Sequence, residues 1–136
     1  MMQRRMLSRE EEAAAGEEVE VRREDQDKIN RFSTLHRKEK ALEEDLKTKQ
    51  KEKEDLEEIS TELELADEDE KVPYKIGDSF VSLPVSEVQE HLSASVEKID
   101  AQVSAVEEKI NNLHEEMQQL KASLYSRFGK QINLEA

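Results

Sequence analysis

Histidine, cysteine and carboxylate side chains are the groups in this sequence that could do metal or acid–base chemistry. His36, His91 and His114 lie far apart along the chain, and there is no cysteine to complete a zinc site. Zinc ligands usually occur in sets of three or four at short, characteristic spacings. We therefore interpret the histidines as solvated surface residues, and the sequence predicts no metal ligand.

The densest acidic run, residues 66–70 (ADEDE), begins like a calcium loop, with Asp67 and Asp69 two positions apart. In such a loop, however, Val72 would replace the glycine of the sixth position and Asp78 would replace the glutamate of the twelfth. The three glycines of the chain form no phosphate-binding loop either. The sequence therefore predicts no enzyme, no catalytic residue and no cofactor.

Composition limits the possible partners and the possible core. The formal net charge is -13, and 40% of residues are charged while 35% are hydrophobic. So acidic a chain suits neither nucleic acid nor an anionic membrane surface, and neither is expected as a partner. A chain with so few apolar residues stays disordered or buries narrow stripes between long helices. No stretch approaches the roughly 20 apolar residues of a membrane span, so we expect a cytoplasmic protein.

The second half of the chain has the periodicity of a coiled-coil helix. Apolar residues recur every seven positions, and a second apolar series follows four positions after successive members. The two series are Val85, Leu92, Ile99, Val106, Leu113 and Leu120, and Val96, Val103, Ile110, Met117 and Leu124. Pro84 precedes a capping-box pattern of Ser86 and Gln89, and Gly129 follows the last turn. The pattern predicts a helix over residues 86–128.

The first half has a weaker copy of the same pattern. Leucine or phenylalanine occupies many seam positions, but Glu39, Lys49, Lys53 and Ser60 occupy others, and residues 47–55 contain no apolar side chain. Helix-forming residues run without Gly or Pro as far as Pro73. We predict a helix over residues 24–66 with a soft middle, preceded by a disordered leader at residues 1–23.

A β-hairpin is predicted between the helices, at residues 72–83. Two alternating strands flank the turn Gly77-Asp78, and Ile76 should pair with Ser79. Either the hairpin is a helix connection packed on its own coiled coil, or hairpins of several chains pair into an oligomeric platform. We favour the platform, because a lone hairpin is marginal in water. Its predicted assembly residues are Val72, Tyr74, Ile76, Gly77, Phe80, Val81 and Leu83.

A second apolar group lies at the far ends of the predicted helices. An antiparallel pairing of the helices brings Phe32 opposite Leu120. Phe32 and Leu124 lie on the seam, and packing that holds the helix ends together accounts for them as well as binding to a partner does. Tyr125 and Phe128 lie off the seam and are better candidates for binding a partner. The candidate tip residues are Ile29, Phe32, Leu124, Tyr125, Phe128 and Ile132.

Three segments of the sequence resemble prefoldin, and in particular its eukaryotic β-class subunits. They are EDQDKINRF (24–32), ELADEDEKVPYKIGDSFVSL (64–83) and LYSRFGKQINLE (124–135). The resemblance covers the chain from about residue 19 onward. It implies a mainly α fold over residues 24–136, with a short tail at residues 129–136. The two helices would form a long antiparallel coiled coil, and the single β-hairpin between them would join an oligomeric β-barrel platform.

The resemblance also implies a function. Prefoldin is a heterohexamer of two α-class and four β-class subunits, an ATP-independent holdase that captures unfolded actin and tubulin and passes them to the cytosolic group II chaperonin. By this resemblance the hairpin would assemble the hexamer, while client binding by the tip is inferred from the expected exposure of its residues. A homodimeric coiled-coil scaffold or tether is the alternative, although a tether needs no hairpin between two helices of matched length.

Overall fold

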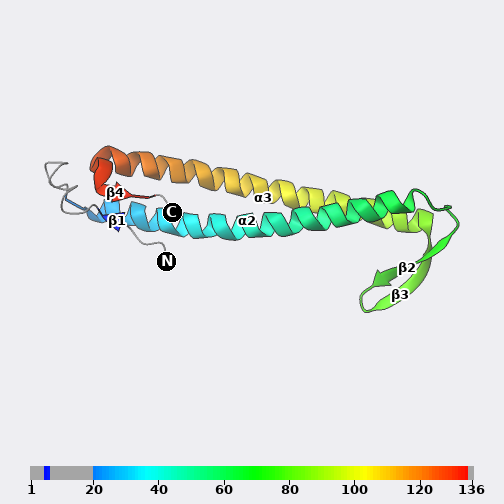
Figure 1. Cartoon of the computed structure of the whole chain (residues 1–136). Coiled ribbons are helices and arrows are strands. Elements are labelled where there is room, and N and C mark those ends of the chain that lie inside the picture. Colours follow the sequence, from blue (N-terminus) through cyan, green and yellow to red (C-terminus); the bar gives the residue numbers. More distant parts are fainter. Residues whose placement is uncertain (1–4, 7–19, 135–136) are drawn as a thin grey trace. The chain divides into compact units, whose positions relative to one another are not determined.

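The computed structural model describes residues 5–6 and 20–134, and two long helices with a β-hairpin between them make up most of it (Figure 1). The elements are β1 (Arg5–Met6), α2 (Arg23–Leu63), β2 (Lys71–Ile76), β3 (Ser79–Pro84), α3 (Val85–Phe128), the 3-10 helix η1 (Gly129–Gln131) and β4 (Ile132–Asn133). The predicted fold of two long helices joined by a hairpin is therefore confirmed. Among the described helices, none has both the length and the apolar character that crossing a bilayer requires.

Helix α2 ends at Leu63, three residues before the predicted end at residue 66. Its last turn contains no basic residue, while acidic side chains crowd the negative end of the helix dipole. The backbone N–H groups of Leu65 and Ala66 donate to carbonyls three residues earlier, at 3.3 and 3.1 Å. The chain thus tightens into turns where the α-helix was predicted to continue.

Helix α3 begins at Val85, so the predicted capping box at Ser86 is wrong. The N–H of Val85 donates to the carbonyl of Glu70 at 2.8 Å, and the N–H of Ser86 donates to that of Glu68 at 3.2 Å. These carbonyls satisfy two of the helix donors that lack partners within the helix. The acidic corner between α2 and β2 therefore caps α3 through its backbone.

The hairpin has the predicted register. Ile76 pairs with Ser79, Tyr74 with Val81 and Val72 with Leu83. Gly77 has a φ of 60°, a left-handed conformation that glycine adopts without steric cost. The strands are one residue longer at each outer end than predicted, reaching Lys71 and Pro84.

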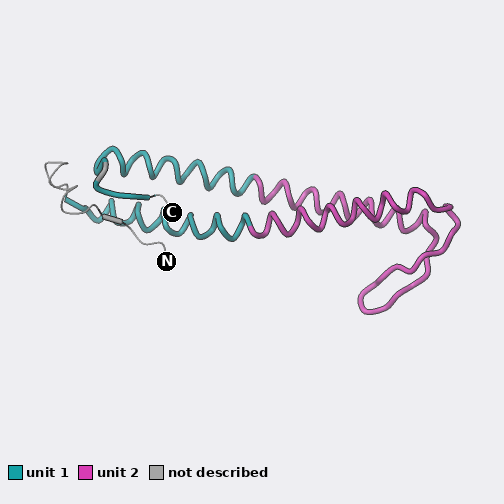
Figure 2. Tube along the Cα trace, in the orientation of Figure 1, with its two compact units in different colours: residues 1–43, 108–136 teal, residues 44–107 magenta. Residues whose placement is uncertain are grey.

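The chain divides into two compact units, residues 1–43 with 108–136 and residues 44–107 (Figure 2). In unit 1 the two helices run antiparallel, because Lys28 contacts Ser123 whereas Arg31, further along α2, contacts Glu116. Strands β1 and β4 form a short antiparallel ladder in the same unit. Most of the leader predicted as disordered, residues 1–23, lies outside the described residues, but Arg5–Met6 are in strand β1.

In unit 2 the buried core comes from α3. Its members are Val85, Val88, Leu92, Ile99, Val103 and Val106. No α2 residue beyond Leu35 is buried, and the Lys53 ammonium lies 2.6 Å from the Asp100 carboxylate. Lys53 occupies a seam position where an apolar side chain would normally pack. The soft middle expected from the polar stretch 47–55 stays a prediction.

Candidate assembly and client-binding sites

The hairpin exposes apolar side chains on both of its faces. Phe80 is 70% exposed, Ile76 56% and Val81 42%. Cross-strand pairing places Ile76 and Val81 on one face and Phe80, which pairs with Lys75, on the other. Of the remaining predicted assembly residues, Gly77 is exposed, and Val72, Tyr74 and Leu83 are half-buried. The structure thus brings the predicted set together on a two-stranded sheet.

One side chain of the hairpin packs on the chain's own helix. The ring of Tyr74 stacks on that of His91 in α3, with centroids 5.2 Å apart and planes at 21°. Tyr74 therefore packs on the chain's own helix, as the alternative interpretation of the hairpin expects. Ile76, Phe80 and Val81 do not, and their exposure leaves apolar surface for a partner.

The predicted tip residues come together in unit 1, but inside a core. Ile29, Phe32, Leu124, Phe128 and Ile132 are all buried. They pack with Leu35, Leu113, Met117 and Leu134. Stapling of the helix ends, the alternative kept open for Phe32 and Leu124, is what the structure shows for both.

The expected exposure of Phe128 is wrong, because the tail folds back over it. Gly129 has a φ of 56° and begins η1, which turns the chain after α3. Ile132 and Leu134 are then 4% and 3% exposed within the same core as Phe128. The client-binding role of the tip residues stays a prediction, but its original ground, exposure, is lost for all of them except the half-buried Tyr125.

Tyr125 connects the tail to the helix. Its hydroxyl accepts a hydrogen bond from the N–H of Leu134 at 3.3 Å, and the Lys121 ammonium lies 5.7 Å from its ring centroid. A cation over an aromatic face is favourable. Tyr125 therefore holds the tail in place and is not simply an exposed side chain for binding a partner.

A partly buried ion pair that was not expected from the sequence lies beside this core. Arg127 Nη2 donates to Asp25 Oδ2 at 2.8 Å and to the Glu20 carbonyl at 2.9 Å. Arg127 Nε lies 2.8 Å from Asp25 Oδ1 as a charge contact. The N–H of Arg22 also donates to Asp25 Oδ2, at 2.9 Å. Asp25 thus caps the start of α2 and joins it to the end of α3.

Opposing effects set the acidity of Asp25. Burial raises the pKa of its carboxyl, but the Arg22 backbone N–H and the Arg127 guanidinium outweigh burial, so the pKa lies below its usual value. A sequence signal for this pair did exist: an acid in the first turn of one helix and an arginine in the last turn of the other.

Further along unit 1, Arg31 and Glu116 form a two-pronged salt bridge, with N···O distances of 2.6 and 3.0 Å. The hydrogen bonds from Arg31 hold the pKa of Glu116 below its usual value, and those same bonds raise the pKa of Arg31. The two side chains are 47% and 40% exposed, so the pair adds little stability.

A family model described as "Prefoldin subunit" matches residues 26–131, which include both helices almost entirely and the whole hairpin. The chain belongs to the prefoldin family. Prefoldin subunit 4 of Saccharomyces cerevisiae is 41% identical over 117 residues, which cover 86% of this chain and 91% of the yeast protein. Prefoldin subunit 4 of Homo sapiens is 37% identical over 90% of this chain and 92% of its own length.

The prefoldin fold also appears among solved structures. The crystal structure of the prefoldin beta subunit from Thermococcus strain KS-1 matches with a TM-score of 0.74, covering 80% of this chain and 96% of that chain. At 16% identity this likeness shows the fold alone. The family match makes the chain a chaperone subunit that associates with other prefoldin subunits, and not an enzyme.

Proposed function

We propose that this prefoldin subunit works in a cytoplasmic, ATP-independent heterohexamer that captures unfolded actin and tubulin and delivers them to the cytosolic group II chaperonin. The observation that supports assembly best is the hairpin, which exposes Ile76, Phe80 and Val81 beside strand edges that pair with no other described strand. The family match supports the choice of other prefoldin subunits as the partners that cover it.

Assembly follows from the physical chemistry of an isolated hairpin. Two strands alone are marginally stable, and their free edges are templates for further strands. Strands from neighbouring subunits satisfy these edges and bury the exposed apolar side chains, which recovers about 25 cal/mol for each Å² of apolar surface. The hairpin residues are thereby the assembly site in this proposal.

Client capture is proposed at the tip of unit 1, through its apolar core. Leu124 is 0% exposed and Phe128 4%, so they reach a client only after the tail at residues 129–134 moves away. A non-native client offers apolar surface of its own and competes with the tail for this core. Six weak tips in one complex then bind with the avidity of many linked sites.

Charge keeps the assembly from binding to itself. The net charge of -13 on this chain adds to the repulsion between neighbouring complexes. An unfolded client still binds the apolar tips because several of them contact it together. In this proposal the complex binds clients without aggregating with other complexes.

The experiment follows dilution of denatured actin by light scattering, with the complex that contains this chain and without nucleotide. We expect the complex to suppress scattering, and addition of group II chaperonin with ATP to recover native actin. Undiminished scattering would contradict capture, and capture with no transfer to the chaperonin would contradict delivery.

A further inference from the structure

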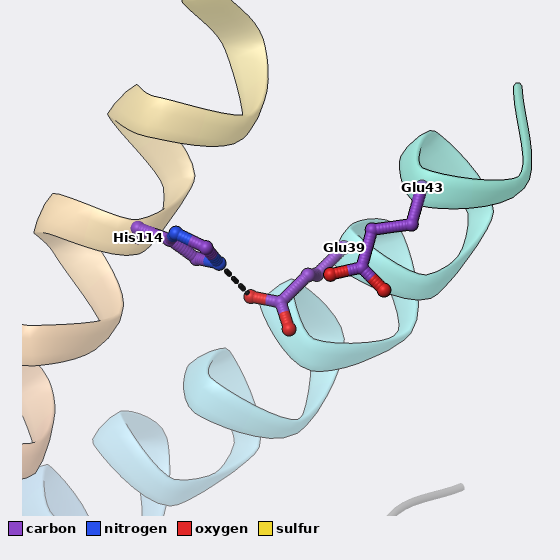
Figure 3. A group of neighbouring side chains, drawn as sticks. All are labelled: Glu39, Glu43 and His114. Carbon is purple, nitrogen blue, oxygen red and sulfur yellow. Dashed lines mark ion pairs between the residues drawn. The ribbon is translucent and has the colours of Figure 1, made fainter. Parts of the chain in front are cut away.

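Three side chains with metal-binding atoms meet across the two helices of unit 1. Glu39 and Glu43 lie one turn apart on α2, and His114 points toward them from α3 (Figure 3). One ligand atom from each residue lies within 4.8 Å of the other two. We propose that Glu39, Glu43 and His114 bind a divalent transition-metal ion of the zinc class.

The distances require only side-chain adjustment. Zinc bonds to imidazole nitrogen and carboxylate oxygen are about 2.0–2.2 Å long, so ligand atoms around a tetrahedral ion are about 3.4 Å apart. His114 Nε2 and Glu39 Oε2 are 2.5 Å apart and need to separate slightly, and a Glu43 carboxylate oxygen lies within 4.8 Å of both. The side chains of Glu43 and His114 are exposed.

The ligand set selects the class of ion. Calcium and magnesium prefer oxygen ligands, and calcium takes six to eight of them. One imidazole with two carboxylates instead suits zinc and its neighbours among the transition metals. Three protein ligands leave the fourth tetrahedral position to water, and a depression of about 540 Å³, whose walls include Glu39 and His114, gives that water room.

Electrostatics also favour a cation at this place. Glutamates four residues apart on a helix repel each other, and among the described residues no lysine or arginine forms an ion pair with Glu43. Glu39 has only 15% of its side chain exposed, and its contact is to a histidine and not to a permanently charged lysine or arginine. A carboxylate removed from water needs a compensating partner. A bound dication neutralises both carboxylates at once.

The site gives a reason for a polar residue on the seam. Glu39 occupies a heptad position equivalent to those of Phe32 and Leu46, which are apolar. A metal that joins Glu39 to His114 would cross-link α2 and α3 beside the tip core and stiffen unit 1. This role is separate from assembly through the hairpin, so it stands or falls independently of the proposed function.

The test is calorimetric titration of ZnCl₂ into the full chain, purified without a histidine tag and first treated with a chelator. We expect one saturable equivalent that excess Mg²⁺ does not displace. His114→Gln and Glu39→Gln should each weaken binding by at least about tenfold, since loss of a residue that merely hydrogen-bonds to a metal ligand already costs about 10–100-fold in other metal sites. Circular dichroism verifies that each variant keeps its helices.

The matched control is His36→Gln. His36 lies on α2 and lines the same depression, but it is not a member of the ligand group. We expect this variant to bind Zn²⁺ like the unaltered chain. Absence of saturable binding, equal affinity in His114→Gln, or a loss in His36→Gln as large as that in His114→Gln would overturn the assignment.

Discussion

Asp25 at the start of α2 is bound by Arg127 at the end of α3, with Arg127 Nη2 2.8 Å from Asp25 Oδ2. Asp25 is only 2% exposed, and Arg127 lies with its guanidinium 5.2 Å from the Phe128 ring centroid. The pair therefore joins the two helix ends beside the core that contains the predicted tip residues. Its charge state controls how firmly that end of unit 1 is held.

Acid should loosen unit 1 through Asp25. Because the pKa of Asp25 is lower in the folded chain than in the unfolded chain, its carboxylate stabilises the fold above the unfolded value, and this contribution disappears as pH falls through the folded pKa. The Asp25→Asn variant lacks this stabilisation already at neutral pH. The midpoint temperature of its thermal unfolding should therefore change less than that of the unaltered chain between pH 7 and about pH 3.

Thermal unfolding followed by circular dichroism across this pH range measures the effect. Asp27→Asn is the matched control, because Asp27 is exposed on the same helix turn. It should keep the acid sensitivity of the unaltered chain. Equal acid sensitivity of Asp25→Asn and the unaltered chain would show that the ion pair does not stabilise the fold.

Removal of apolar volume from the tip core should destabilise the isolated chain. Leu124 is 0% exposed, and Leu124→Ala should cost about 2–5 kcal/mol in urea unfolding, from lost burial and the cavity left behind. The same substitution at Leu65, which is 93% exposed, should change the free energy of unfolding by less than about 0.5 kcal/mol. Similar costs at the two positions would contradict the closed core.

A charge on the hairpin should block assembly. Ile76→Asp places a carboxylate on apolar surface that neighbouring subunits are proposed to cover, so the variant should be absent from the complex on a sizing column. Ile59→Asp is the control, since Ile59 is 45% exposed on α2 and Ile76 is 56% exposed on the hairpin. Normal incorporation of Ile76→Asp would rule out the hairpin as the assembly site.

The tail should compete with clients for the tip core. Leu134 is 3% exposed, and Leu134→Ser weakens the cover, so it should increase suppression of actin aggregation at a given concentration of complex. Phe128→Ser removes apolar surface from the core itself and should decrease suppression while the complex stays assembled. If the two variants suppress aggregation equally, the proposed opening of the tail is wrong.

The elements that the sequence predicts are those set by local patterns. The heptads of α3 and the Gly77-Asp78 turn specify a helix and a hairpin register through neighbours close in the chain, and both agree with the structure. The fold of the tail depends on Ile132 and Leu134 reaching a core built from both helices. Periodicity contains no information about such a contact, so Phe128 was wrongly expected to be exposed.

Long-range polar pairs are missed for the same reason. Glu39 and His114 are far apart in the sequence, and each alone looks like an ordinary charged or polar residue of a helix. Their meeting depends on the register and on the rotation of α2 against α3 within unit 1. The register expected from the sequence, with Phe32 opposite Leu120, says which turns face each other but not which side chains meet. The end of α2 was misplaced because residues 64–66 are helix formers whose preference is overcome by turns at an acidic helix end.

The most direct test of assembly through the hairpin is the native mass of the particle that co-purifies with this chain under gentle conditions. Six subunits of this size predict about 95 kDa, from 15.8 kDa each, with several different chains in the peak. A particle of about 32 kDa that contains only this chain, at twice 15.8 kDa, would contradict the heterohexamer and favour a homodimeric scaffold.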